Sequence, residues 1–63
     1  MDRDDSPINT VDVAQLLGLS RKTIEAWRYS GYGPQWHRIG RRSIRYYRSE
    51  VEAWLAEQER RSA

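Results

Sequence analysis

Residues 37–48 are the part of the chain whose side chains are best suited to hold a ligand. They read HRIGRRSIRYYR, with five arginines, no acidic residue, and isoleucine and tyrosine between the cations. Guanidinium groups stay charged at physiological pH and donate paired hydrogen bonds to phosphate and carboxylate oxygens. The stretch therefore predicts a site for an anion, and the rest of the chain must show which anion and how the arginines are positioned.

Positive charge is concentrated in the middle of the chain. Residues 21–48 hold eight basic residues against Glu25, a net charge of +7, whereas residues 1–20 carry −3 and residues 49–63 carry −2. A basic centre between acidic ends is expected of a surface that binds a polyanion such as nucleic acid. Two alternatives are a solvated basic face without a ligand and an interaction module that holds an acidic partner.

Length and composition exclude several classes of protein. A chain of 63 residues with three Trp, four Tyr and 32% charged residues suits one small domain with an aromatic core. With no Cys and one His, we expect no disulfide, no metal site and no cofactor or small-molecule ligand. No apolar run approaches the roughly 20 residues that span a bilayer, so we expect no membrane partner and a cytoplasmic location.

Two capping patterns predict a pair of short helices near the start of the chain. Asn9, with an acidic residue three positions later, predicts a helix from Thr10 to about Leu17 that ends at Gly18. Ser20 predicts the N-cap of a second helix over residues 21–30. Because only two or three residues separate the helices, they must cross sharply, as in a helix-turn-helix.

Residues 10–29, TVDVAQLLGLSRKTIEAWRY, resemble the helix-turn-helix signature of DNA-binding proteins. Ala14 occupies the position of a small residue between the helices, and Gly18 occupies the turn. The signature assigns buried positions to Val13, Leu17, Leu19, Ile24 and Trp27. The alternative interpretation is an αα-hairpin without a ligand.

The second helix carries the candidate residues for reading DNA. With Ile24 and Trp27 directed to the core, a helical wheel turns Lys22, Glu25, Ala26 and Tyr29 outward. The second helix of this motif presents its N-terminal residues to base edges in the major groove. We therefore expect a recognition set of Ser20, Arg21, Lys22, Thr23, Glu25 and Arg28.

These residues suit different parts of the duplex. Arg21 and Lys22 suit guanine O6 and N7, and Thr23 can donate a hydrogen bond or meet a thymine methyl. Glu25 either accepts from cytosine N4 or orients a neighbouring arginine, Arg21 or Arg28, and we favour the orienting role. Arg28 is expected to bind a phosphate, which positions the protein without reading sequence.

A β-hairpin is predicted after the second helix, which Gly33 and Pro34 end. Alternating residues over 36–39 and 43–46 flank a turn around Gly40, Arg41 and Arg42. This two-stranded arm is a wing, and arginines at its tip suit the negative potential of a narrow minor groove. The strand residues Arg38 and Arg45 are better placed for phosphates.

A third helix is predicted after the hairpin. Ser49 followed by Glu52 forms the pattern of a capping box, and Val51, Trp54 and Leu55 share the face expected to pack on Trp27 and Leu17. Residues 1–6 and 60–63 are expected to be disordered. Residues 1–63 are thus predicted to form a single winged-helix domain, mainly α with a small β-hairpin, in which a helix-turn-helix, a two-stranded wing and a C-terminal helix follow one another.

The succession VAQLLGLSRKTIEAWRYSGYGPQWHRIGRRSIRYYRSEVEAWL resembles the small winged-helix proteins of the MerR-like superfamily, in particular phage excisionases and AlpA-like regulators. The resemblance covers about two-thirds of the chain and is carried by LGLSRKTI, GYGP, RIGRR and RYYRSEVEAWL. It implies sequence-specific binding to double-stranded DNA, with Arg21, Lys22, Thr23 and Arg28 in the major groove and Arg41 and Arg42 in the wing. Ser43 lengthens the wing by one residue relative to the usual IGRRVRY pattern, which leaves open which arginine occupies the tip.

The resemblance also implies a biological role. An excisionase, or recombination directionality factor, binds repeated attachment-site sequences cooperatively, bends the DNA and directs an integrase to excise a prophage. Such a protein would be a monomer in solution, self-associate on DNA and stay with the nucleoid of the host cell. The alternative is a small phage or prophage transcriptional regulator of the AlpA or MerR-like type. Eight residues follow Leu55, and this favours the excisionase, because MerR-type regulators usually add a long dimerisation helix.

An enzymatic function is not expected. His37, Tyr46 and Tyr47 beside several arginines are groups that a tyrosine recombinase uses, in which Arg and His stabilise the phosphate under attack by Tyr. All of them lie in one hairpin, and no catalytic domain fits in 63 residues. We therefore predict no catalytic residue, and we interpret His37 as a half-buried strand residue and the tryptophans as core.

Overall fold

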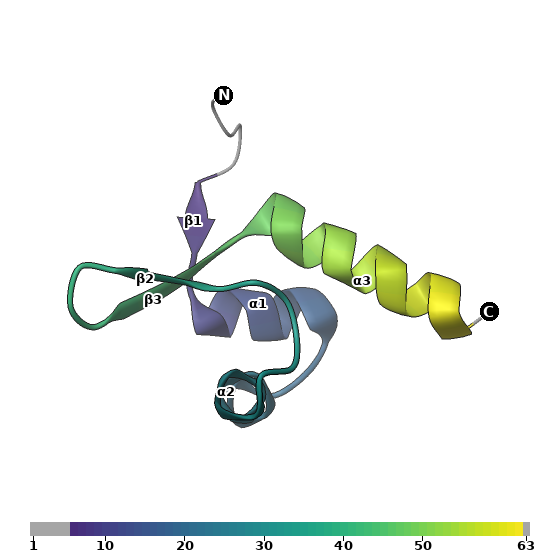
Figure 1. Cartoon of the computed structure of the whole chain (residues 1–63), viewed down its shortest axis with the longest axis horizontal. Helices are drawn as coiled ribbons and strands as arrows, with labels where there is room; N and C mark the ends of the chain where they lie inside the picture. The colour runs from purple at the N-terminus through teal and green to yellow at the C-terminus, as the bar shows by residue number, and fades with distance from the viewer. Residues whose placement is uncertain (1–5, 63) are drawn as a thin grey trace.

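The computed structural model describes residues 6–62, which form three helices and a three-stranded antiparallel sheet. The elements follow in the order β1 (Pro7–Ile8), α1 (Thr10–Leu17), α2 (Arg21–Ser30), β2 (His37–Ile39), β3 (Ser43–Tyr47) and α3 (Arg48–Ser62). Figure 1 shows the β2–β3 hairpin extending from one side of α1 and α3 extending from the other. The fold is a winged helix-turn-helix, as predicted, and it is mainly helical.

The two predicted caps position α1 and α2. The Asn9 side chain accepts a hydrogen bond of 2.8 Å from the Asp12 backbone, and the Asp12 carboxylate accepts one of 3.2 Å from the Asn9 backbone. Gly18 adopts the left-handed conformation, with φ 72°, and ends α1. Ser20 Oγ accepts from the Thr23 backbone at 3.2 Å and starts α2. Both helices therefore have the predicted bounds, and the turn between them is short.

The sheet has one strand more than predicted. β2 pairs with β3, and Ile39 lies opposite Ser43, so Gly40 to Arg42 form a three-residue turn with Arg41 in its middle. β1 pairs with the other edge of β3, where Ile8 lies opposite Tyr46. Two residues are too few to show strand periodicity, which is why no sequence pattern indicates β1.

The core draws one or two residues from each of four elements. Its buried members are Val13, Ala14, Ile24, Tyr46 and Val51. Leu17, Trp27 and Trp36 are partly buried and pack against this cluster. The burial predicted for Leu19 is wrong: its side chain is 43% exposed, because the residue lies in the turn between α1 and α2.

An aromatic cluster joins the end of α2 to α3, as predicted for Trp27 and Trp54. Their ring centroids lie 5.4 Å apart, and the Tyr32 ring stands edge-on to both, at 5.1 Å from Trp27 and 5.7 Å from Trp54. Gly33 passes beside this cluster with φ 97°, and a Cβ there would lie 2.7 Å from Trp27 Cε3. The glycine is therefore required both by its backbone conformation and by the ring next to it.

The third helix differs from the prediction at both ends. α3 begins at Arg48, directly after β3 and one residue before the predicted cap at Ser49. The disorder predicted for residues 60–63 is wrong for residues 60–62, which continue the helix. Glu57 forms ion pairs with Arg60 and Arg61 one turn later, and these pairs support the last turn. The disorder predicted for residues 1–5 and 63 falls outside the described residues.

Residues 6–62 contain no helix long and apolar enough to cross a membrane.

Candidate nucleic-acid interface

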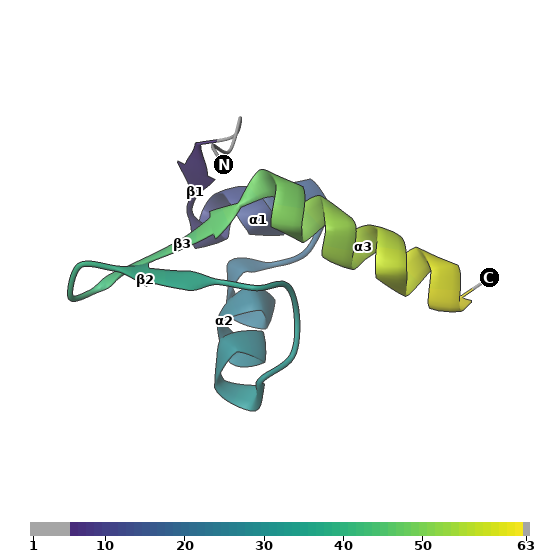
Figure 2. The ribbon, with the colours of Figure 1, turned by 45° about the horizontal axis from the view of Figure 1, so that its top comes forward.

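A trough lies between α2 and the wing, which is the β2–β3 hairpin. Figure 2 shows how α2 and this hairpin are arranged relative to each other. It consists of two adjacent hollows, and Arg28 and Ile44 line both. The larger hollow, about 460 Å³, is bordered by residues 9–11 at the start of α1, by Arg21 and Arg28 of α2, and by residues 42–45 of the wing. The smaller one, about 230 Å³, is bordered by Arg28, Tyr29, Trp36, Arg38 and Ile44.

The trough is strongly basic. Five arginines line it, and none of its residues is acidic: Arg21, Arg28, Arg38, Arg42 and Arg45. The first and last of these arginines, Arg21 and Arg45, are 24 positions apart in the sequence. The fold therefore brings together on one surface arginines that belong to a helix and to a hairpin. The start of α1 adds the positive end of a helix dipole to the same surface.

Arg28 is held in place by two other elements. Its Nη1 donates to Thr10 Oγ1 at 3.0 Å and to the Tyr46 hydroxyl at 3.1 Å, and Tyr46 is 1% exposed. These bonds connect α2 to the first residue of α1 and to the core face of β3. The guanidinium therefore has a fixed position at the junction of the two hollows before any ligand binds.

Glu25 lies against Arg21 at the start of α2. Glu25 Oε2 is 3.4 Å from Arg21 Nε, and the two side chains are 39% and 61% exposed. This pairing is the geometry that an orienting role requires. Among the ion pairs of residues 6–62, Glu25 pairs with Arg21 and not with Arg28.

The remaining predicted residues of α2 lie at its first turn. Ser20 Oγ and Thr23 Oγ1 are 3.0 Å apart, and Ser20 also caps the helix, so the two hydroxyls are engaged with each other. Lys22 is exposed and lies outside the trough. Base contacts from Ser20, Lys22 and Thr23 remain predictions.

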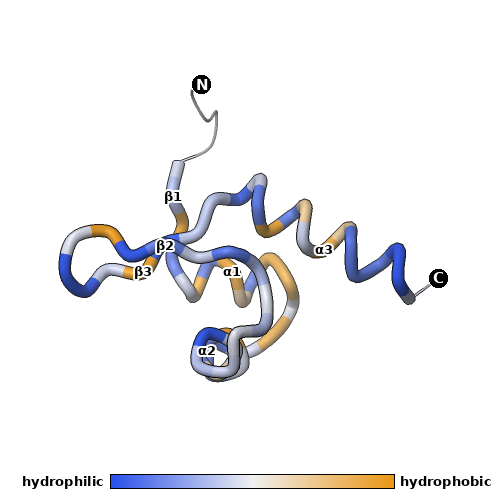
Figure 3. The backbone as a smooth tube through the Cα atoms, in the orientation of Figure 1, coloured by the Kyte–Doolittle hydropathy of each residue, from blue (hydrophilic) through white to orange (hydrophobic). Residues whose placement is uncertain are grey.

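The wing arginines are unpaired with acid. Within residues 6–62, Arg38, Arg41, Arg42 and Arg45 form no ion pair with a carboxylate. Arg38 instead has its Cζ 5.8 Å from the centroid of the Trp36 ring, and Arg45 Nη1 donates to the Ile44 carbonyl at 2.8 Å. Arg41 and Arg42 lie in the turn between β2 and β3, and Figure 3 shows hydrophilic colour at this tip of the hairpin. Such cations are available to an external anion.

Sequence reasoning missed three parts of the trough. The capping pattern at the start of α1 predicts a role in the fold only, and it does not predict that residues 9–11 border the larger hollow. The prediction of a core position for Trp36 agrees with its packing on the core, but it does not indicate that Trp36 also lines the smaller hollow. The helical wheel correctly predicts that Tyr29 lies on the outward face of α2, where it is 92% exposed, but it does not predict that Tyr29 borders the smaller hollow.

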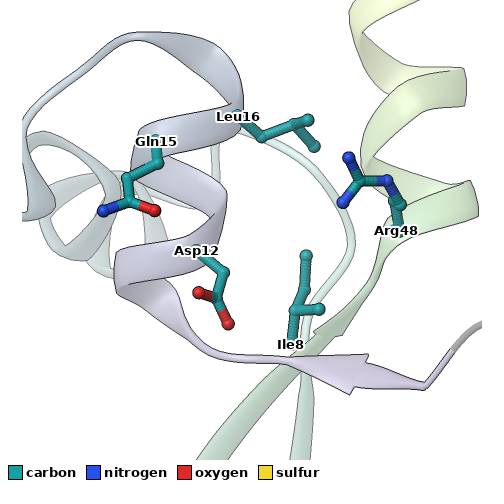
Figure 4. A pocket seen from close by; sticks show the side chains of 5 residues that line it. All are labelled: Ile8, Asp12, Gln15, Leu16 and Arg48. Carbon is teal, nitrogen blue, oxygen red and sulfur yellow. The ribbon is translucent and has the colours of Figure 1, made fainter.

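A third hollow lies between α1 and the start of α3 (Figure 4). It is bordered by Ile8, Asp12, Gln15, Leu16 and Arg48. Asp12 belongs to the capping box of α1, and Arg48 Nε lies 3.2 Å from Glu52. Because Asp12 brings a negative charge to this hollow and Arg48 is already paired with Glu52, it suits an anion less than the trough does. No cluster of three potential metal ligands occurs in the part of the chain that the structure describes.

Comparison with known families agrees with the helix-turn-helix formed by α1 and α2. The family model described as "Helix-turn-helix domain" matches residues 8–59, from β1 through most of α3. No curated protein matches the chain.

Proposed function

We propose a mode of DNA binding on the premise that the chain belongs to the helix-turn-helix domain family. A helix-turn-helix domain indicates DNA binding, and its second helix, here α2, enters the major groove. We propose that the wing reaches the neighbouring minor groove. The sugar-phosphate backbone of the DNA strand that separates the two grooves then lies in the trough. The observation that carries this proposal is the gathering of five arginines without an acidic residue between α2 and the wing.

Individual residues take different roles in this complex. Arg21 contacts base edges with Lys22 and Thr23, and the ion pair with Glu25 supports its orientation. Arg28, Arg38 and Arg45 bind phosphates along the trough, and the tip residues Arg41 and Arg42 enter or border the minor groove. Ser20 acts at the same end of α2, where it caps the helix.

The proposed biological role is that of an excisionase. The resemblance of GYGP, RIGRR and RYYRSEVEAWL to small phage excisionases supports it. In this role the protein binds repeated attachment-site sequences cooperatively as single domains, bends the DNA and directs an integrase toward prophage excision. Contact with two grooves at once suits a protein that bends DNA, because it holds the duplex at two separate places along the helix axis.

The first experiment tests the wing. Replacing Arg41 and Arg42 together by Ala should weaken binding on every duplex and reduce the slope of log Kd against log salt, by roughly 0.9 for each phosphate that the wing no longer neutralises. The matched control replaces Arg60 and Arg61, which removes the same charge from α3 outside the trough and should leave the slope unchanged. An unchanged slope in the Arg41 and Arg42 variant would remove the wing from the interface.

A second experiment tests the role in excision. Gel-shift assays on attachment-site fragments with the site at permuted positions measure binding, cooperativity and bending together. We expect several complexes that form over a narrow range of protein concentration and whose mobility depends on the position of the site. A single complex with position-independent mobility would contradict the excisionase and favour the transcriptional regulator.

A further inference from the structure

The smaller hollow of the trough has a composition that phosphate binding alone does not explain. Besides Arg28 and Arg38 it is lined by Tyr29, Trp36 and Ile44. Tyr29 is 92% exposed, so its position at the hollow is not a consequence of core packing. The larger hollow is lined mainly by cationic and polar residues, with Val11 and Ile44 as its apolar members and no aromatic ring, whereas the smaller one adds two aromatic side chains to its cations.

The two arginines of this hollow are both held in position. Arg28 is fixed by its hydrogen bonds to Thr10 and Tyr46. Arg38 lies opposite Ile44 in the β2–β3 register, with its guanidinium over the Trp36 ring at 5.8 Å. A cation held over an aromatic face loses less side-chain entropy when it binds an anion. The hollow thus presents two ordered cations with apolar surface near them.

We propose that Tyr29, Trp36 and Ile44 form a subsite for one deoxyribose of the DNA strand that lies in the trough, with the two adjoining phosphates bound by Arg28 and Arg38. This proposal rests on the proposed DNA-binding function and deepens it. The sugar is the apolar part of a DNA backbone, and a phosphate lies on each side of it. The hollow has matching groups, because its apolar lining lies next to two arginines. A stacked base fits less well, because Arg38 already lies over the Trp36 ring and the rest of that side chain packs on the core.

Tyr29 and Trp36 have different roles in this subsite. Tyr29 contacts the sugar directly, since its ring is exposed beside the hollow. Trp36 is a positioning residue, which acts through the guanidinium of Arg38. The two roles predict different responses to substitution, and both are measured by fluorescence anisotropy on a duplex selected from a random-sequence library.

Tyr29→Ala tests the sugar contact. We expect about a fivefold loss of affinity at every salt concentration, because the substitution removes apolar contact and no charge. The slope of log Kd against log salt should therefore equal that of the wild-type protein, and Tyr29→Phe, which keeps the ring, should lose less. Wild-type affinity in the Ala variant would overturn the sugar contact.

Single methylphosphonate linkages in the duplex test the two phosphates. Such a linkage removes the charge of one phosphate, so a walk along the strand should reveal two consecutive sensitive positions that belong to Arg28 and Arg38, besides the positions bound by Arg45 and the wing. Arg38→Gln should lose its sensitivity at one of these positions and keep it at the other. Arg60→Gln, which removes a charge from α3, should keep both. An Arg38→Gln variant that remains sensitive at both positions would overturn the assignment of Arg38.

A double-mutant cycle tests the positioning role of Trp36. Trp36→Phe keeps an apolar ring against the core but offers a weaker cation–π partner. We expect it to weaken binding about threefold in the wild-type background and to have no effect in the Arg38→Gln background. Equal losses in both backgrounds would show that Trp36 does not act through Arg38. Circular dichroism at the assay temperature confirms that each variant is folded.

The outcomes separate this subsite from the general mode of binding. If the duplex is bound and the Arg41 and Arg42 variant has the reduced salt slope, but Tyr29→Ala and Arg38→Gln bind like the wild type, only the subsite is wrong. If no duplex is bound, both proposals are wrong. If a duplex with one unpaired base binds more tightly and Tyr29→Ala abolishes that gain, the hollow holds a base, and the deoxyribose proposal is overturned.

Discussion

At the scale of single residues, Arg28 has the largest structural role among the basic residues of α2. One of its nitrogens serves two acceptors on two other elements, and one of these acceptors, the Tyr46 hydroxyl, belongs to a side chain that is 1% exposed. Hydrogen bonds from a charged donor contribute more than neutral ones, about 1.5 to 3 kcal/mol. The residue therefore stabilises the angle between α2 and the wing as well as presenting a charge.

The Tyr46 hydroxyl can be removed without disturbing the core. Tyr46→Phe keeps the buried ring and leaves Arg28 with one acceptor fewer, so we expect the free energy of unfolding to fall by about 1 to 2 kcal/mol. Urea unfolding followed by circular dichroism measures this change. Tyr29→Phe is the control, because that side chain is almost fully exposed and should unfold like the wild type. An unfolding midpoint of Tyr46→Phe equal to the wild type would show that the bond to Arg28 adds no stability.

Residue-level prediction worked where a partner lies within one helical turn. The caps at Asn9 and Ser20 and the ion pair of Arg21 with Glu25 involve residues three or four positions apart, and such spacings are visible in a sequence. The bonds of Arg28 span 18 positions in each direction, to Thr10 and to Tyr46. No local pattern encodes them, because they depend on how α1, α2 and the sheet pack.

At the scale of elements, the path of the chain after α2 depends on the close contact between the backbone of Gly33 and the ring of Trp27. Gly33→Ala would introduce a Cβ 2.7 Å from Trp27 Cε3 at a φ of 97°, so both the clash and the backbone conformation oppose it. We expect a loss of about 2 to 4 kcal/mol of stability. Gly31→Ala is the matched control, because Gly31 has φ 77° and open space around it, and its loss should be about 1 kcal/mol. Equal thermal shifts of the two variants would show that the Trp27 contact is unimportant.

The same cluster attaches α3 to the helix-turn-helix. Trp54→Ala removes a ring that contacts both Trp27 and Tyr32, and truncation of such an aromatic costs about 3 to 5 kcal/mol. A domain of this size has little stability to lose, so we expect the variant to be largely unfolded by near-ultraviolet circular dichroism. Trp54→Phe, which retains a ring, should stay folded. A normal melting curve for Trp54→Ala would mean that the other contacts of α3, such as the buried Val51 and the bond between His37 and Glu50, suffice to hold the helix.

Element boundaries were predictable where a strong local signal exists and not elsewhere. Asn9, Gly18 and Ser20 fixed α1 and the start of α2, and the turn at Gly40 fixed the wing. β1 has two residues and exists because β3 offers an edge for it. α3 continues beyond its last apolar residues because Glu57 forms ion pairs with two arginines. In the sequence, such a polar segment resembles a disordered tail.

At the scale of the whole molecule, the sequence shows the amount of charge and the structure shows its arrangement. The +7 charge of residues 21–48 was evident from composition, and so was its suitability for nucleic acid. The trough was not, because its arginines come from a helix and a hairpin whose relative angle depends on the core around Ile24 and Tyr46. A basic composition alone would fit a flat surface equally well.

Gathering cations on one face should make the DNA-free protein sensitive to salt. Four of the five trough arginines have no ion pair within the described residues, and the molecule measures 38 × 30 × 19 Å. The Debye length is about 30 Å at 10 mM salt, which is comparable to the size of the molecule, and about 10 Å at 100 mM. Raising the salt concentration from 10 to 100 mM therefore screens the repulsion between arginines across the molecule. We expect the Tm of the free protein to rise by roughly 2 to 5 °C between 10 and 100 mM NaCl at pH 7.

Substitution of two trough arginines makes this prediction specific. Arg42→Gln combined with Arg45→Gln should raise the Tm at 10 mM NaCl and flatten its dependence on salt, because less repulsion remains to be screened. Arg60→Gln should instead lower the Tm at 10 mM NaCl, since it removes a residue that pairs with Glu57. It should not flatten the dependence of the Tm on salt, because it leaves the trough intact. Differential scanning calorimetry measures all three proteins in the same buffers. A wild-type Tm that falls with salt would mean that the ion pairs of α3 outweigh the repulsion within the trough, and that the basic surface costs the free protein little stability.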